Sequence, residues 1–144
     1  MTTSFSNPAA TQARRDGRAA AIGVAAARIV LGLIFTLAGI SGFAFLFVPA
    51  PPAPPGLPSL FMEVFFKTHW VQFVDGVQLI AGVLLLGNRY VPLALVALAA
   101  VIANILVFHI TMQPAGLPVP IVVVALWFVV AYSRRDDLAP LLRK

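Results

Sequence analysis

Residues 76–109, GVQLIAGVLLLGNRYVPLALVALAAVIANILVFH, decide the fold class of this chain. They form two apolar runs, separated by the short polar sequence GNR at residues 87–89. A helix of about 20 apolar residues covers roughly 30 Å of hydrocarbon, and a glycine followed by polar residues favours a turn between two helices. We therefore expect two membrane spans here, at about residues 70–86 and 90–111.

The whole chain fits the same class. Its 144 residues are 60% hydrophobic and 10% charged, and the mean hydropathy is +0.96. Two further apolar runs predict spans at about 29–48 and 117–132, and the proline-rich sequence PAPPAPPGLP at 49–58 ends the first of them. Four spans leave no room for a soluble domain, and the short later turns favour antiparallel neighbours. We expect an all-α integral membrane protein, an antiparallel four-helix bundle.

Outside the spans the sequence predicts tails and one surface segment. Residues 1–18 are polar and predict a disordered tail, residues 19–133 form the membrane domain, and residues 134–144 form a basic tail. Residues 59–68 predict a short amphipathic helix that lies along the surface or extends the next helix. It carries a Glu63–Lys67 pair, and its apolar side is formed by Leu60, Phe61, Val64 and Phe65. Arg28 marks the first interface, where its guanidinium is expected to snorkel to the headgroups.

The basic residues predict the orientation. In the four-span reading Lys67 is alone on one side, whereas eight basic residues share the other, namely Arg14, Arg15, Arg18, Arg89, Arg134, Arg135, Arg143 and Lys144. The positive-inside rule then places both termini in the cytoplasm, for a multi-pass protein of an inner or plasma membrane. Because the charges lie at span ends with no basic surface between them, the net charge of +5 does not indicate nucleic-acid binding.

A few polar side chains interrupt the apolar spans. Gln72, Asp75 and Gln78 follow one another at three-residue intervals on one helical face, and Asp75 and Asn104 are expected at similar depths, about 8–9 Å below the outer boundary. A carboxyl group at that depth is protonated, paired with a donor such as Asn104 or a histidine, or open to a water-filled vestibule. Asn104 and Gln78 have the plainer alternative of hydrogen bonding between helices.

Two histidines, His69 and His109, are expected near the same outer boundary. Both are ordinary interfacial residues in the simplest interpretation, and His109 is expected to point about 140° away from Asn104 on its helix. Two histidines at similar depth are too weak a pattern to predict haem. The chain has no cysteine, which excludes thiolate and disulfide chemistry, and its sequence shows no catalytic motif and no metal-ligand cluster. Any redox role needs a partner or a bound cofactor such as a quinone.

Three stretches resemble a known family. ARIVLGLIFTLAGISGF at 27–43, the opening stretch at 76–109 and MQPAGLP at 112–118 are similar to the DoxX-like small four-helix membrane proteins. The resemblance covers about residues 27–133, and Arg28, Asn104 and His109 match its pattern. Gln78 stands where the family often has an acidic residue, and Gly42 lies about where its first motif often ends in lysine. The resemblance implies the fold, and association with quinone-linked or oxidative-stress oxidoreductases.

These observations support three hypotheses of function. The first is an accessory or anchoring subunit of a redox system that has no catalysis of its own and presents a quinone or docks an oxidoreductase, with Asp75, Asn104 and His109 at the outer site. The second is a small transporter or proton path that uses Asp75. The third is a structural membrane protein whose polar groups only hold helices together. The glycines of the spans also permit a homo-oligomer in the bilayer.

Overall fold

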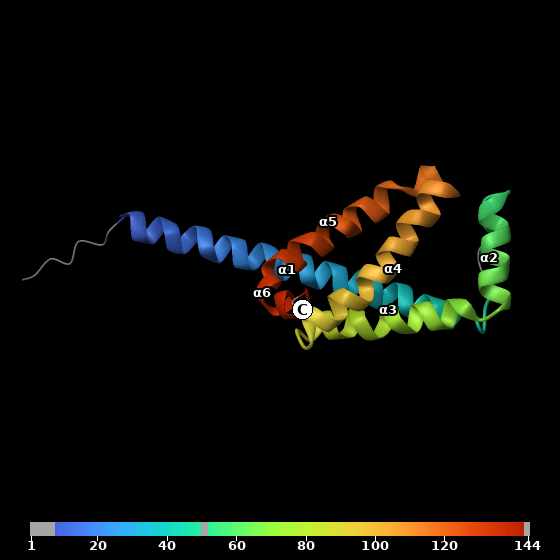
Figure 1. The fold of residues 1–144 in the computed structure, drawn as a ribbon, viewed down its shortest axis with the longest axis horizontal. Helices are drawn as coiled ribbons and strands as arrows, with labels where there is room; N and C mark the ends of the chain where they lie inside the picture. The colour runs from blue at the N-terminus through green and yellow to red at the C-terminus, as the bar shows by residue number, and fades with distance from the viewer. Residues whose placement is uncertain (1–7, 50–51, 143–144) are drawn as a thin grey trace, which may run out of the picture.

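The computed structural model describes residues 8–49 and 52–142, and that part of the chain is helical without any strand (Figure 1). The elements in order are α1 (Pro8–Ala44), α2 (Leu57–Lys67), α3 (Trp70–Leu86), α4 (Val91–Thr111), the short 3-10 helix η1 (Pro114–Gly116), α5 (Pro118–Ser133), α6 (Arg135–Leu138) and the 3-10 helix η2 (Ala139–Leu142). Only a few residues join α2 to α3, α3 to α4 and α5 to α6. The observed bounds of α3, α4 and α5 lie within a residue of the ranges expected for the last three spans.

Two helices are long and apolar enough to cross a membrane, Gln12–Ala44 within α1 and α4. A third candidate is the bent pair formed by α2 and α3, if the two are counted as one span, and α5 is a shorter apolar helix. Large apolar side chains also cover the outside of the molecule, among them Leu37, Phe73, Ile80, Leu93, Val107, Val119 and Phe128. A surface of this kind needs an apolar surrounding such as lipid, and the protein is therefore a membrane protein.

The first helix is longer than the sequence suggested. It begins at Pro8 and continues without a break through residues 8–18, the region expected to be a disordered tail. Alanine and arginine are strong helix formers, and Gln12 donates a hydrogen bond of 3.0 Å from Nε2 to Oδ1 of Asp16, one turn later. The segment is helical because of its propensity, although residues 12–18 are exposed. Figure 1 shows this end of α1 projecting away from the other helices.

Glycines bring α1 and α3 into close contact. A Cβ added to Gly39 would lie 2.6 Å from the backbone oxygen of Asp75, and one added to Gly82 would lie 2.6 Å from the backbone nitrogen of Thr36. Gly32 likewise faces Leu86 at 2.9 Å. The two backbones can approach this closely only because these positions lack side chains. This glycine-lined face is therefore covered by a helix of the same chain.

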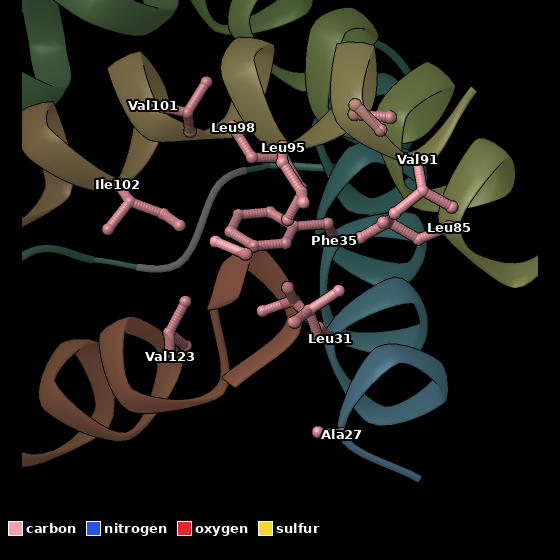
Figure 2. Close-up of a cluster of buried hydrophobic side chains, with 14 residues drawn as sticks. Ala27, Leu31, Phe35, Leu85, Val91, Leu95, Leu98, Val101, Ile102 and Val123 are labelled. Carbon is pink, nitrogen blue, oxygen red and sulfur yellow. The ribbon is translucent and has the colours of Figure 1, made fainter. Parts of the chain in front are cut away.

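The main core lies between α1, α3, α4 and α5 (Figure 2). Phe35 and Leu31 of α1 pack there against Leu95 and Leu98 of α4, and all four are 2% exposed or less. One hydrogen bond also joins α5 to α4, from Nε1 of Trp127 to the carbonyl oxygen of Leu95 at 2.9 Å. The remaining members of the core are Ala27, Ala81, Leu85, Val91, Ala94, Val101, Ile102, Val123, Val130 and Ala131.

A sharp corner separates α2 from α3. The two helices are bent by 83° relative to each other, and His69, the residue before α3, has a left-handed backbone with φ 58° and ψ 17°. α2 then lies across the molecule toward the end of α4, where the ring centroids of Phe61 and Phe108 are 5.1 Å apart. Phe61, Met62 and Phe65 are half-buried on this inner side, whereas Leu60 and Val64 are exposed. The expected apolar face of this helix was thus partly wrong.

Candidate functional site

Four of the polar residues singled out in the sequence line one cleft. Asp75 and Gln78 come from α3, and Asn104 and His109 come from α4. The cleft has a volume of about 170 Å³. Phe61, Met62 and Phe65 of α2 lie over it and form its roof. We had not predicted from the sequence that α2 would contribute to a site.

Asp75 is buried, with 9% of its surface exposed. Its Oδ1 accepts a hydrogen bond of 2.5 Å from Nε2 of Gln78, one turn further along α3. The donor is therefore Gln78 and not Asn104 or a histidine. Among the ion pairs of the described residues, which join Lys67 to Glu63, Arg134 to Asp137 and Arg135 to Asp136, none includes Asp75.

Gly42 of α1 provides the space for the Asp75 carboxyl group. A Cβ at this position would overlap Oδ2 and Cγ of Asp75. From the sequence we interpreted Gly42 only as a small residue for helix packing and as a departure from the family pattern. In the structure it is the reason why a carboxyl group fits between α1 and α3.

His109 is held by its own helix. Its Nδ1 lies 2.8 Å from the carbonyl oxygen of Ile105. A carbonyl oxygen only accepts hydrogen bonds, so this contact assigns the proton to Nδ1 and leaves Nε2 as an acceptor in the neutral ring. Gly116 gives the ring room, because a Cβ there would lie 2.6 Å from Cδ2 and 2.9 Å from Nε2 of His109. A glycine in MQPAGLP thus has a steric role beside the histidine.

A larger apolar cavity of about 400 Å³ adjoins the cleft. Both share the side chains of Gln78, Ile105 and His109. The rest of the larger cavity is formed by α1, α4, α5 and the loop before α5, through Ile34, Phe35, Ala38, Ile102, Gly116, Val119, Pro120 and Val123. Such a volume is within the range of about 300–1,000 Å³ that small-molecule sites occupy. The two spaces together combine an apolar chamber with a polar edge.

Asn104 differs from the helix-to-helix role considered for it. Its side chain is exposed, and within residues 8–49 and 52–142 it makes no hydrogen bond. It lines the cleft under α2 and a second one of about 270 Å³ beside Trp70. His109 lines the first of these as well, despite the angle of about 140° expected between the two side chains.

Gln72 and His69 lie outside this group. Gln72 donates a long hydrogen bond of 3.4 Å from Nε2 to the carbonyl oxygen of Gly42, and its buried Oε1 has no partner in the described part of the chain. His69 is exposed at the corner between α2 and α3. Of the six polar residues singled out in the sequence, four therefore line one cleft, whereas Gln72 and His69 do not.

The amphipathic helix carries the expected ion pair. Nζ of Lys67 lies 2.6 Å from Oε1 of Glu63. The hydrogen bond from Lys67, together with its charge, lowers the pKa of Glu63, so this carboxylate stays ionised. Both side chains are exposed, and the pair adds little stability.

Arg28 makes a contact that the sequence did not predict. Its Nη1 donates to the carbonyl oxygen of Leu85 and lies 3.3 Å from that of Leu86. A cation is favourable at the carboxyl end of a helix, where the helix dipole is negative. Arg28 therefore caps α3 from α1, and its predicted place at the first interface stays a prediction.

Comparisons of this chain with protein-family models, with curated proteins and with solved structures found no match.

Proposed function

We propose that this chain is a four-span protein of the inner or plasma membrane, an antiparallel bundle of α1, α3, α4 and α5 with both termini in the cytoplasm. The exposed apolar side chains of α3 and α5, such as Phe73, Ile80, Val119 and Phe128, support this arrangement. These helices have 17 and 16 residues, about 24–26 Å at 1.5 Å per residue. A membrane that thins locally around them accommodates such lengths.

The proposed role is that of a DoxX-like accessory subunit that binds a quinol or quinone for a partner oxidoreductase. One observation carries it: the apolar cavity and the polar cleft adjoin and share Gln78 and His109. A quinol consists of a flat ring with two hydroxyl groups and an apolar tail. The cavity suits the ring, and the polar edge suits the hydroxyl groups.

The polar edge is rich in acceptors. Nε2 of His109 has a free lone pair when Nδ1 is bonded to Ile105. The Asp75 carboxyl group also accepts, and the Asn104 amide can accept or donate. A quinol donates two hydroxyl protons, whereas a quinone only accepts, so this site is expected to prefer the quinol. Oxidation of the bound quinol to quinone releases two electrons and two protons, and the proposal assigns that step to the partner.

Binding of a short-chain ubiquinol analogue to the full chain in nanodiscs tests the proposal. His109→Asn is expected to weaken binding roughly two- to tenfold, the loss of one hydrogen bond. His69→Asn is the matched control, because His69 is exposed outside the cleft, and it should bind as the natural chain does. Equal binding of the quinol and quinone forms of the analogue, or equal losses in the two variants, would contradict the site.

A partner is tested on the same protein in its native membrane. Gentle extraction followed by mass spectrometry is expected to find quinone and an oxidoreductase subunit in stoichiometric amounts. Phospholipid alone would remove the support for an accessory subunit.

One observation favours a second candidate, a proton path. Asp75 is a buried carboxyl group that takes part in no ion pair of the described residues, and such groups inside a membrane often carry protons or ions. The test measures proton flux into vesicles that contain the protein. Loss of this flux in Asp75→Asn, while the variant unfolds at the same temperature as the unsubstituted protein, would favour this candidate over quinol binding.

A further inference from the structure

A separate cleft lies where α1, the turn between α3 and α4 and the end of α5 meet. Its volume is about 420 Å³. Arg28, Asn88, Ser133 and Arg134 supply its polar groups. It shares no lining residue with the cavity or the cleft at His109.

Contacts with the protein hold both arginine side chains in place. Arg28 donates from Nη1 to the carbonyl oxygens at the end of α3. Arg134 donates from Nη2 to Oδ1 of Asn88 at 3.0 Å, and its Nη1 lies 3.6 Å from Oδ2 of Asp137. A guanidinium group has five N–H donors. In the described part of the chain Nε and Nη2 of Arg28 and Nε of Arg134 have no partner.

The balance of charge in the cleft is positive. Asp137 partly offsets the charge of Arg134, whereas Asp136 pairs with Arg135, at 3.9 Å. Arg28 takes part in no ion pair of the described residues. A bound anion would therefore contact the guanidinium group of Arg28, which has no acidic partner among the described residues, and that of Arg134, whose charge Asp137 partly offsets.

The wall contributed by α1 leaves room and continues the positive charge. Ala21 and Ala25 line the cleft with small side chains. Arg14, Arg18, Ala21, Ala25 and Arg28 are spaced by four, three, four and three residues, which puts them on one face of the helix. The arginines of this face thus extend from the cleft along the projecting end of α1.

We propose that this cleft binds the phosphate group of an anionic membrane phospholipid. Arginine favours phosphate because its planar donors match two phosphate oxygens at once. Val24 and Val130 line the same cleft and offer apolar surface to the glycerol and the first methylene groups. Basic pockets between helices at the cytoplasmic side of a membrane are suited to anionic headgroups. This cleft shares no lining residue with the proposed quinol site, so each proposal is tested by its own experiment.

The test titrates the full chain in neutral detergent with phosphatidylglycerol or phosphatidylcholine and counts bound lipid by native mass spectrometry. Phosphatidylglycerol is expected to bind at least tenfold more tightly. Arg134→Gln should weaken its binding roughly fivefold, the effect of one basic residue near an anionic lipid. Arg135→Gln is the matched control: this arginine is the next residue, is exposed, and its guanidinium carbon lies 4.8 Å from the centre of the Tyr132 ring.

Arg28→Lys provides a second variant that keeps the charge. A lysine cannot offer the paired donors, so phosphatidylglycerol binding should fall while the unfolding temperature stays close to the natural value. Equal binding of the two lipids, or equal losses in Arg134→Gln and Arg135→Gln, would overturn the proposal, since either result indicates general surface charge. Displacement of phosphatidylglycerol by millimolar inorganic phosphate would overturn the assignment to a lipid and indicate a free phosphate.

Discussion

The two sides of α1 differ in how closely they are packed. Toward α3 the glycines allow contact between backbones, and a single methyl group would overlap the neighbouring helix. Toward α4 and α5 a cavity of about 400 Å³ remains between larger side chains. Glycines close the first side, whereas Ile34, Phe35 and Ala38 of α1 line the open cavity on the second. The position of a binding space in this protein therefore follows from where the glycines are.

The largest expected effect comes from breaking the closed side. Gly39→Ala places a methyl group 2.6 Å from backbone atoms of α3 and should lower the free energy of unfolding by about 1–3 kcal/mol. Gly76→Ala is the control, because the nearest atom to its added Cβ is 3.7 Å away on Phe43. Thermal unfolding in detergent measures both, and equal stabilities would refute the close packing of α1 on α3.

Filling the open side should have the opposite sign. Ala38 lines the apolar cavity, and Ala38→Leu adds three carbon atoms to an empty space. We expect stability to rise by about 0.5–2 kcal/mol, as in other cavity-filling changes, and quinol binding to fall. Ala26→Leu, on the exposed side of the same helix, controls for helix propensity. A destabilised Ala38→Leu variant would mean that the cavity is closed in the membrane.

A smaller effect is expected at the contact between the helices that border the open side. Trp127→Phe removes the hydrogen bond from α5 to the Leu95 carbonyl group of α4, and such bonds in membranes are worth about 0.6 kcal/mol. Trp70→Phe, at an exposed position, should change stability less. Denaturation of both variants in the same detergent compares them, and the reverse order would contradict this role of Trp127.

The smallest effect should occur inside the closed side. Oγ1 of Thr36 is buried and has no hydrogen-bond partner in the described part of the chain. Thr36→Val keeps the shape and removes the unpaired hydroxyl group, so stability should stay equal or rise by a few tenths of a kcal/mol. A clear loss of stability on thermal unfolding would show that the hydroxyl group has a partner in the membrane.

The bounds of α3, α4 and α5 were predictable because proline, glycine and polar turns end each apolar run. The extent of α1 was not, since polarity at residues 8–18 was given more weight than helix propensity. The similar depths of Asp75, Asn104 and His109 predicted one outer site, and these three residues line one cleft. The roof that α2 forms over it was not predictable, because its position is set by a corner that no periodic pattern encodes.

That corner also determines where the roof lies relative to the cleft. Only Thr68 and His69 separate α2 from α3, so the tilt of α2 changes chiefly through the torsion angles of these two residues. A left-handed backbone costs a residue other than glycine about 1–2 kcal/mol. The position of the roof over the cleft therefore depends on the backbone conformation of two residues, neither of which lines that cleft.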